Sequence, residues 1–408
     1  MLGTGAWFAA FGIQSVLFTW LVAMELRESP SNVGVAQMCF LLPTTVLILF
    51  GGSLADRFGP RWLVIRAQAL AVLPLIGLLY LLATETLSFT ALLVYAVLMG
   101  TVQAFVTPSR DGLLSQVAGA EVQRAVVKTS LVQFGLQMVG LALSAMADRF
   151  GPEPLVVAQI VSLLFGAYAY SRISADVDEH LERQTHGQQK SLFAAVSDSL
   201  REGAKTVFVS APMRSIIWLN IAMGVFFMGA YMVATPLLIR EHYSTDTSAL
   251  AGLNAANSMG LFLMAVVLLR IGTLLRPGRA LLFAQILGGL VLALGFLDIA
   301  YWLFVVIIFF WGLCGGVAMS MSRSVMQELA PPGQRGRVMS FYSLAMMGAG
   351  PLGALWAGYM CEWLDARTTL LINGLAMTVF SSVIYLSRSL AELKIPPAPT
   401  QTSDSLGN

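Results

Sequence analysis

The sequence predicts an all-α membrane protein with 12 transmembrane helices, arranged as two six-helix halves. Hydrophobic residues make up 57% of the 408 residues and charged residues only 11%, whereas soluble domains carry roughly 25% charged residues. Apolar runs of about 20 residues, the length that crosses a bilayer, recur along the whole chain. Basic residues are concentrated in every second connection between these runs. The first two observations make the bilayer the solvent of this chain, and the third orients it.

The apolar runs form two groups of six, separated by a polar interval. The leading 24 residues are apolar but have neither the basic n-region nor the cleavage site of a signal peptide, so we expect a first membrane helix there. The predicted spans lie at 3–24, 33–54, 62–83, 89–109, 125–147 and 154–171, and then at 214–239, 248–269, 279–298, 301–322, 338–360 and 368–387.

The distribution of Lys and Arg predicts that both termini are cytoplasmic. With the N-terminus inside, all 24 basic residues fall on the cytoplasmic side except Arg27, Arg149, Arg240 and Arg367. An excess of basic residues in cytoplasmic connections is the rule for membrane proteins. Short connections and the lack of an organelle-targeting extension favour a bacterial inner membrane.

The chain is expected to have four parts. Within the polar interval, apolar residues recur at helical spacing and predict an amphipathic helix on the cytoplasmic face, with Ser191 as its N-cap. These apolar residues are Leu192, Val196, Leu200, Ala204 and Val207. The predicted parts are an N-terminal six-helix bundle over 1–171, a cytoplasmic linker over 172–213, a C-terminal six-helix bundle over 214–390 and a disordered tail over 391–408.

The two halves carry related sequences. Identical residues recur at a constant separation of 213 positions, as in a duplicated unit. The matched pairs include Ser109 with Ser322, Arg110 with Arg323, Arg124 with Arg337, Gly135 with Gly348 and Gly140 with Gly353.

A shorter repeat lies inside the first half. The hexapeptide ADRFGP occupies 55–60, after the second predicted span, and again 147–152, after the fifth. With the predicted orientation these two connections lie on opposite faces of the membrane. Two inverted three-helix repeats would place them at equivalent corners. The repetition therefore predicts a 3+3 inverted organisation of each half.

The segment GGSLADRFGPRW, at 51–62, resembles the loop 2–3 signature of the major facilitator superfamily, G-x-L-a-D-R-x-G-x-R. Pro60 stands where that signature commonly has Arg or Lys. The segments TPSRDGLL and REGAKTVF are similar to those of macrolide-efflux and siderophore-export proteins within the superfamily. The resemblance implies a secondary transporter with alternating access, in which helices 1, 4, 7 and 10 line a central cavity.

The signature residues are expected to act in gating. Asp56 lies at a predicted helix end, where its charge can face the positive N-terminus of a neighbouring helix. Arg57 and Arg61 can pair with carboxylates across the interface between the halves, and Gly59 permits a tight turn. The resemblance implies that these residues, with Gly52, hold the cytoplasmic side closed until the cavity opens inward. The alternative is that the charges only orient the chain.

Polar and aromatic residues inside the spans are candidate substrate contacts. Aromatic and amide side chains suit a bulky, partly apolar ligand. Packing between helices is the alternative for each of them. The candidates are Phe11, Gln14, Phe18, Gln103, Gln137, Asn220, Phe227, Tyr231, Asn257 and Trp311.

A proton carrier is harder to find in the sequence. A carboxylate deep in the membrane is the natural carrier in a proton-coupled transporter, yet no Asp or Glu lies in the middle third of a predicted span. Glu25, at the outer end of the first span, is the candidate. A solvated helix end is the alternative for this residue.

These observations favour export of a small amphiphilic compound, drug-like or siderophore-like, in exchange for protons. A charged substrate would need an opposite charge in mid-membrane, and the predicted spans have none there. The alternative is an importer or facilitator of a small metabolite on the same fold. No His lies in a span and no Cys or His spacing fits a metal, so we expect neither an enzyme nor a metal or cofactor. The net charge of +2 gives no basic patch for nucleic acid, and we expect a monomer in the lipid bilayer.

Overall fold

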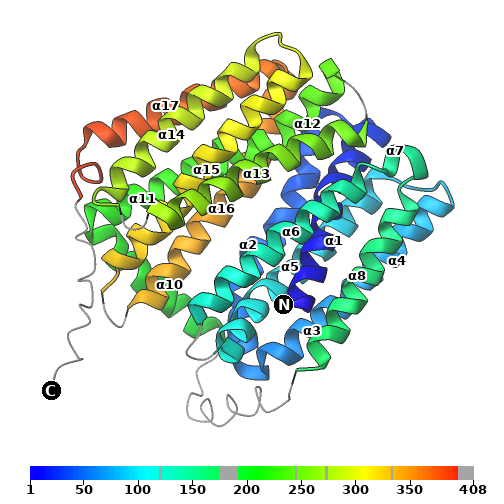
Figure 1. The fold of residues 1–408 in the computed structure, drawn as a ribbon, viewed down its shortest axis with the longest axis horizontal. Coiled ribbons are helices and arrows are strands. Elements are labelled where there is room, and N and C mark those ends of the chain that lie inside the picture. The colour runs from blue at the N-terminus through cyan, green and yellow to red at the C-terminus, as the bar shows by residue number, and fades with distance from the viewer. Residues whose placement is uncertain (119–121, 174–191, 244–245, 272–273, 332–333, 394–408) are drawn as a thin grey trace.

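The computed structural model describes residues 1–118, 122–173, 192–243, 246–271, 274–331 and 334–393. In these ranges the regular elements are helices, and 12 helical segments are long and apolar enough to cross a membrane. The prediction of an all-helical protein with 12 spans is confirmed. Figure 1 shows the spans packed side by side.

The first six spans, which we call the N-terminal half, come from residues 2–171. Span 1 packs against spans 5 and 6, and span 2 packs against span 4. In order, the spans are α1 (Leu2–Trp20) continued by the π-helix η1 (Leu21–Glu25); α2 (Pro30–Phe58); α3 (Pro60–Leu70) with α4 (Val72–Ala83); α5 (Phe89–Ala118); α6 (Val122–Ser144) with α7 (Ala147–Phe150); and α8 (Glu153–Ser171).

The last six spans form the C-terminal half. Span 7 is built from α11 (Ala211–Ala222), the π-helices η3 (Met223–Met228) and η4 (Ala230–Ala234), α12 (Thr235–Leu238) and the π-helix η5 (Ile239–Tyr243). The others are α13 (Thr247–Ile271), α14 (Pro277–Ala293) with the 3₁₀ turn η6 (Leu294–Phe296), α15 (Tyr301–Leu329), α16 (Arg335–Trp363) and α17 (Ala366–Leu386). Span 7 is thus the least regular of the twelve.

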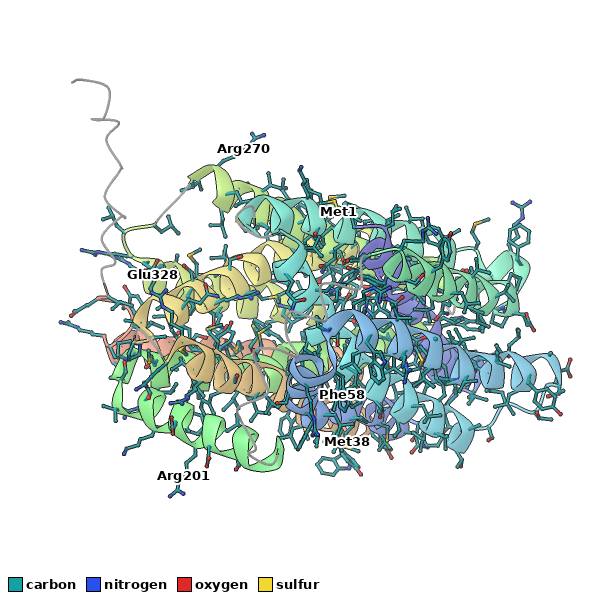
Figure 2. The ribbon with its side chains drawn as sticks, turned by 90° about the horizontal axis from the view of Figure 1, so that it is seen from below. Met1, Met38, Phe58, Arg201, Arg270 and Glu328 are labelled. Atoms are coloured by element: carbon teal, nitrogen blue, oxygen red, sulfur yellow. The ribbon has the colours of Figure 1, made fainter. Side chains whose placement is uncertain are left out.

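Because the number of spans is even, the first span begins at the same end of the bundle at which the last span ends. We call this end the terminal face. The opposite end is the distal face. The connecting helix α10 (Leu192–Val209) lies at the terminal face and packs against α16, where Phe208 and Phe341 have ring centroids 6.0 Å apart. Glu202 of α10 pairs with Arg337 of α16. Arg201 and Arg270 point away from the bundle (Figure 2).

Helix α10 thus lies between the halves in the chain and packs on the protein itself. Ser191, its expected N-cap, lies outside the described residues, as do 174–191 of the predicted linker and 394–408 of the predicted tail.

The two copies of ADRFGP have the same backbone geometry. Each ends a helix at Phe58 or Phe150, and the following glycine has a positive φ, 87° at Gly59 and 83° at Gly151. Glycine adopts this conformation without steric cost. The proline that follows is the first residue of α3 in one copy (Pro60), where its fixed φ suits the first turn, and the N-cap of α8 in the other (Pro152).

The two halves touch closely where α2 meets α16, towards the distal face. A Cβ atom on Gly358 would stand 2.9 Å from the Cα of Gly34 and 2.9 Å from the carbonyl oxygen of Pro30. Small residues allow helix backbones to approach in this way inside membranes. The halves are thus in backbone contact at one end of the bundle.

Candidate functional site

A cavity of about 880 Å³, which we call the main cavity, lies between the halves on the side of the terminal face. Its walls are the last turns of α2 and α5 from the N-terminal half and α15 and α16 from the C-terminal half, with Leu200 of α10 at its edge. Four of the lining residues are methionines, namely Met319, Met339, Met346 and Met347. Unbranched, polarisable methionine side chains adapt to ligands of different shape.

The main cavity has one acid and one base from opposite halves. Asp111 of α5 and Arg323 of α15 both line it. Asp111 accepts hydrogen bonds from Arg110, with distances of 3.1 Å to Nε and 3.0 Å to Nη2. The Arg110 guanidinium also lies over the ring of Phe8, 4.7 Å from its centroid. Arg110 is therefore held in place, while Asp111 remains largely exposed to the cavity.

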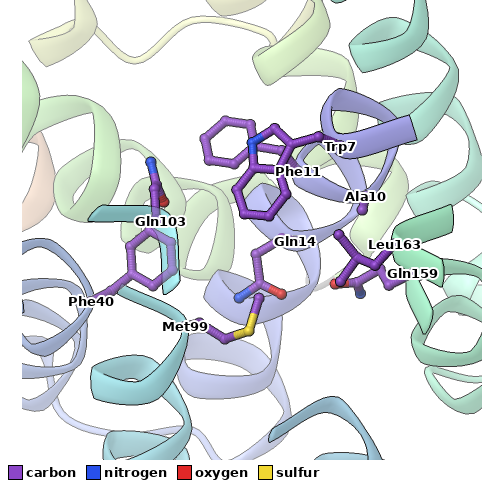
Figure 3. Close-up of a pocket in the computed structure, with 9 residues that line it drawn as sticks. All are labelled: Trp7, Ala10, Phe11, Gln14, Phe40, Met99, Gln103, Gln159 and Leu163. Atoms are coloured by element: carbon purple, nitrogen blue, oxygen red, sulfur yellow. The ribbon is translucent and has the colours of Figure 1, made fainter. Parts of the chain in front are cut away.

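Two smaller pockets lie deeper, beyond the main cavity towards the distal face. One, of about 50 Å³, lies between the halves and is lined by Phe11, Gln14 and Phe18 of α1 and by Tyr231 and Asn254. We call it the interface pocket. The other, of about 20 Å³, lies within the N-terminal half between α1, α2, α5 and α8 (Figure 3). We call it the amide pocket, because Gln14, Gln103 and Gln159 all line it.

The amides of these pockets are only partly satisfied. The Tyr95 hydroxyl donates to Oε1 of Gln14 at 2.5 Å, and the Tyr231 hydroxyl donates to Oδ1 of Asn254. The Nε2 atoms of Gln14 and Gln159 are buried and have no partner. In Figure 3 the two side chains lie on different sides of the pocket, and the oxygen of Gln14, not its nitrogen, lies on the side of Gln159. Two residues that line one small pocket therefore each have a donor without a partner.

The sequence-predicted substrate residues divide into two sets. Phe11, Gln14, Phe18, Gln103 and Tyr231 line the amide pocket or the interface pocket. The structure brings these five together, from spans 1, 4 and 7.

The other predicted residues lie at helix contacts. Asn220 is buried and accepts a hydrogen bond from the Ser322 hydroxyl at 3.0 Å. The Phe227 ring stands edge-on to Trp311, with centroids 5.5 Å apart. Gln137 and Asn257 lie where neighbouring helices approach closely. A Cβ atom on Gly12 would meet the backbone carbonyl oxygen of Gln137, and one on Gly312 would meet that of Asn257. These five residues line none of the three cavities described above.

The signature residues surround the terminal-face end of α2. Gly52 lines the main cavity. Nη2 of Arg61 donates to the carbonyl oxygen of Ser171 at 2.8 Å, which joins spans 3 and 6 of one half. Arg57 is exposed, with its guanidinium 5.4 Å from the Phe58 ring centroid. The side chain of Asp56 lies outside the described part of the structure.

Glu25 is exposed at the distal end of span 1, as the last residue of η1. It lines none of the three cavities. In the described part of the chain, no group of three His, Cys, Asp or Glu side chains is arranged to hold a metal ion.

The family of the chain follows from comparison with known proteins. A family model described as a transmembrane secretion effector matches residues 3–401. The chain belongs to the transmembrane secretion effector family of the major facilitator superfamily. It is a multi-pass membrane transporter and not an enzyme.

Relatives of this transporter have related descriptions. The MFS-type transporter YfiS of Bacillus subtilis is 24% identical over 391 residues, covering 91% of this chain and 88% of the relative. The multidrug efflux pump Tap of Mycolicibacterium fortuitum is 25% identical, with coverage of 96% and 95%. A Na⁺, Li⁺, K⁺/H⁺ antiporter of Planococcus maritimus is 25% identical, with 83% of each chain covered.

Solved structures agree with the fold of this transporter. The nucleoside transporter NupG superposes with a TM-score of 0.68 at 12% identity, covering 94% of this chain and 96% of that one. The inward-open xylose transporter XylE of E. coli gives a TM-score of 0.68, with 11% identity and coverage of 98% and 96%. At this identity the likeness concerns the fold alone.

Proposed function

We propose that this transporter exports a small amphiphilic compound by alternating access, in exchange for protons. The main cavity is the observation that carries the proposal. It lies between the halves, it is closed towards the distal face, and methionine, hydroxyl and amide side chains line it beside one acid and one base. Such a surface accommodates a ligand with both apolar and polar parts.

The proposed orientation puts the terminal face in the cytoplasm of a bacterial cell and the distal face outside the inner membrane. The support is the distribution of Lys and Arg, which leaves only four of 24 on the distal side. With this orientation the cavity opens inward, as an exporter needs in order to collect its substrate. The description of the family as secretion effectors and the name of the Tap pump favour the same direction.

The amide pocket narrows the substrate class. A buried donor without a partner costs about 1–3 kcal/mol, and a ligand acceptor recovers that cost. Nε2 of Gln14 and Nε2 of Gln159 are two such donors, and both residues line one space beside the rings of Trp7 and Phe11. The space holds about one oxygen atom or water molecule. We infer a substrate that inserts a carbonyl, ether or similar acceptor oxygen there and leaves its apolar part in the interface pocket.

The signature around Asp56 is proposed to close the terminal face after substrate enters. Gly52 borders the main cavity, and Arg61 already ties spans 3 and 6 together, so the segment 51–62 moves with one half as a unit. Removal of the Asp56 charge by Asp56→Asn should then slow transport without changing the fold.

Proton coupling has two candidate carriers. The name of the Planococcus relative, a cation/H⁺ antiporter, supports H⁺ as the coupling ion. Glu25 is the candidate from the sequence, and Asp111 is the carboxylate that the structure adds, because it lines the main cavity together with Arg323 and accepts hydrogen bonds from Arg110. Protonation of Asp111 would change the charge balance of the cavity directly.

The test is accumulation of ethidium, a rhodamine dye, erythromycin and a hydroxamate siderophore in cells that express the chain. Each compound is measured with and without a protonophore, and the Asp56→Asn variant serves as the transport-impaired control. Lower accumulation that the protonophore abolishes supports energised export. Higher accumulation of any compound in expressing cells contradicts export and favours the importer.

A further inference from the structure

Two carboxylates join the halves of this transporter at the distal face. Asp148, in the second ADRFGP copy, accepts hydrogen bonds from the backbone N–H groups of Thr247 and Ser248 at 2.8 and 3.0 Å. Glu362, at the end of α16, accepts one from the N–H of Ser31 at 3.0 Å. Each contact runs from one half of the molecule to the other.

Both carboxylates contact the first turn of a long helix. Thr247 and Ser248 begin α13, which has 25 residues, and Ser31 is in the first turn of α2, which has 29. The first N–H groups of a helix have no partner inside it, and the positive end of the helix dipole attracts anions. The negative charges on Asp148 and Glu362 therefore stabilise these contacts.

The two contacts are equivalent under exchange of the halves. Asp148 lies at the end of span 5 and contacts the start of span 8, whereas Glu362 lies at the end of span 11 and contacts the start of span 2. A shift of six spans along the chain converts the first contact into the second. One carboxylate of each half thus holds the other half, on both sides of the interface.

A basic residue adds a third contact at the same face. Nη1 of Arg240, at the end of span 7, donates to the carbonyl oxygens of Ala23 at 3.0 Å and of Glu28 at 2.8 Å. Ala23 lies in the last turn of span 1, where carbonyl groups are free and the helix dipole is negative. The contacts across the distal face thus pair charged side chains with helix ends.

The contacts lie between the interface pocket and the distal face. Leu250 and Asn254 of α13 line that pocket, and they follow Thr247 by about one and two helical turns. On the opposite side of the interface, Ser15 and Thr19 of α1 line the same pocket below Ala23. Opening of the three contacts would therefore expose the pocket to the distal side.

We propose that Asp148 and Glu362 are the paired carboxylates of a distal gate, which holds the outer side closed while the main cavity is open and releases once in each transport cycle. The inference rests on the proposed alternating access. Asp148 occupies the same place in its hexapeptide as Asp56 does in the first copy. A similar sequence element thus serves a gate at each face.

The test measures how often the distal gate opens. Ser15→Cys is introduced after replacement of Cys39, Cys314 and Cys361 by Ala, and a membrane-impermeant maleimide is added to intact cells. In the proposed orientation the reagent reaches position 15 through the distal face, so the alkylation rate reports the open population without any substrate. Labelling after denaturation normalises the amount of protein.

Asp148→Asn and Glu362→Gln are expected to raise the alkylation rate by about two- to thirtyfold each, the range that a charge at a helix N-terminus produces. The double variant should multiply the two effects, and Asp148→Glu should restore most of the wild-type rate because it keeps the charge. The control is Asp298→Asn, whose carboxylate pairs with Arg367 inside its own half at 2.5 Å. It should leave the rate unchanged.

Equal rates in wild type, Asp148→Asn and Glu362→Gln would overturn the gate, as would an equal rise in Asp298→Asn. Elution of each variant as a single species in gel filtration separates gate opening from misfolding. Because no substrate is present, a chain that fails to export the tested compounds still reports on the gate. Slower labelling in both variants would support the gate and overturn the proposed membrane orientation instead.

Discussion

The carboxylate of Asp148 accepts a hydrogen bond from the backbone N–H of Thr247 at 2.8 Å, although the two residues belong to different halves of the molecule. The contact links the repeated hexapeptide of the N-terminal half to the start of α13. It lies at the face opposite the main cavity. The structure therefore combines a closed distal side with a cavity on the terminal side, which is one of the two states that alternating access requires.

Gly358→Ala is predicted to hinder closure of the distal side. The added methyl would stand 2.9 Å from both Gly34 Cα and the Pro30 carbonyl oxygen, and backbone atoms cannot turn aside as a side chain can. Overpacking of this kind costs about 1–3 kcal/mol. We expect export to fall about tenfold and the alkylation rate at position 15 to rise. Gly77→Ala is the matched control, because no atom lies within 4 Å of its added methyl; a similar loss of export there would contradict the steric explanation.

Gln159→Leu is predicted to have opposite effects on stability and on binding. Its Nε2 is buried without a partner, so a leucine should stabilise the empty protein by about 1 kcal/mol. The same change removes a donor to the substrate, so KM for an oxygen-bearing substrate should rise by about two- to tenfold. Thermal unfolding and concentration-dependent transport check the two effects.

Gln68→Leu separates these effects. Both amide atoms of Gln68 are buried without partners between α3 and α8, and the residue lines none of the cavities described above. Gln68→Leu should therefore stabilise the protein and leave KM for the substrate unchanged. A rise in KM for Gln68→Leu equal to that for Gln159→Leu would show that the amide pocket has no direct role.

Sequence patterns predicted the spans well because hydropathy is a local property. Which side chains of span 7 face the pockets is harder to predict, because it depends on the backbone geometry of that span. Helical spacing groups Asn220, Phe227 and Tyr231 on one stripe; in the structure Tyr231 lines the interface pocket, and the rings of both Phe227 and Tyr231 pack against Trp311. The π-helices η3 and η4 lie within this stretch, and their i→i+5 hydrogen bonds change the angular step per residue. A helical wheel drawn at 3.6 residues per turn therefore does not describe this stretch.

The distal contacts were missed although the sequence contains a signal for them. Arg27–Glu28 and Arg240–Glu241 repeat at the same separation of 213 that relates the two halves. In the structure Arg240 reaches the end of span 1. The pairing of Asp148 with Thr247 leaves no such trace, because its acceptor is a carboxylate but its donors are backbone groups that any residue has.

Asp111→Asn is predicted to uncouple transport from protons, while Glu25→Gln retains coupling. Asp111 lines the main cavity and is paired with Arg110, whereas Glu25 lies at the distal end of span 1 outside the cavities. Dye efflux from energised cells should lose its sensitivity to a protonophore in Asp111→Asn. If Glu25→Gln alone loses that sensitivity, the carrier is at the distal end of span 1 and the assignment of Asp111 is wrong.

Asp365 is predicted to make stability depend on pH in the acid range. It is the N-cap of α17, where its carboxylate accepts hydrogen bonds from the backbone N–H of Thr368 at 2.8 Å and from the Thr368 hydroxyl at 2.7 Å. Burial by itself raises the pKa of Asp365, but these hydrogen bonds and one from the Arg367 N–H lower it by more, so the pKa lies below its usual value. The stabilisation is therefore complete above the unfolded pKa of about 4 and is lost as the pH falls through the lower folded pKa.

Asp365→Ala should cost about 1 kcal/mol at pH 7. Asp365→Asn, which also caps helices but does not titrate, should cost little at pH 7 and should reduce the fall in melting temperature between pH 6 and pH 3. An unchanged fall in Asp365→Asn would assign the acid sensitivity to other carboxylates.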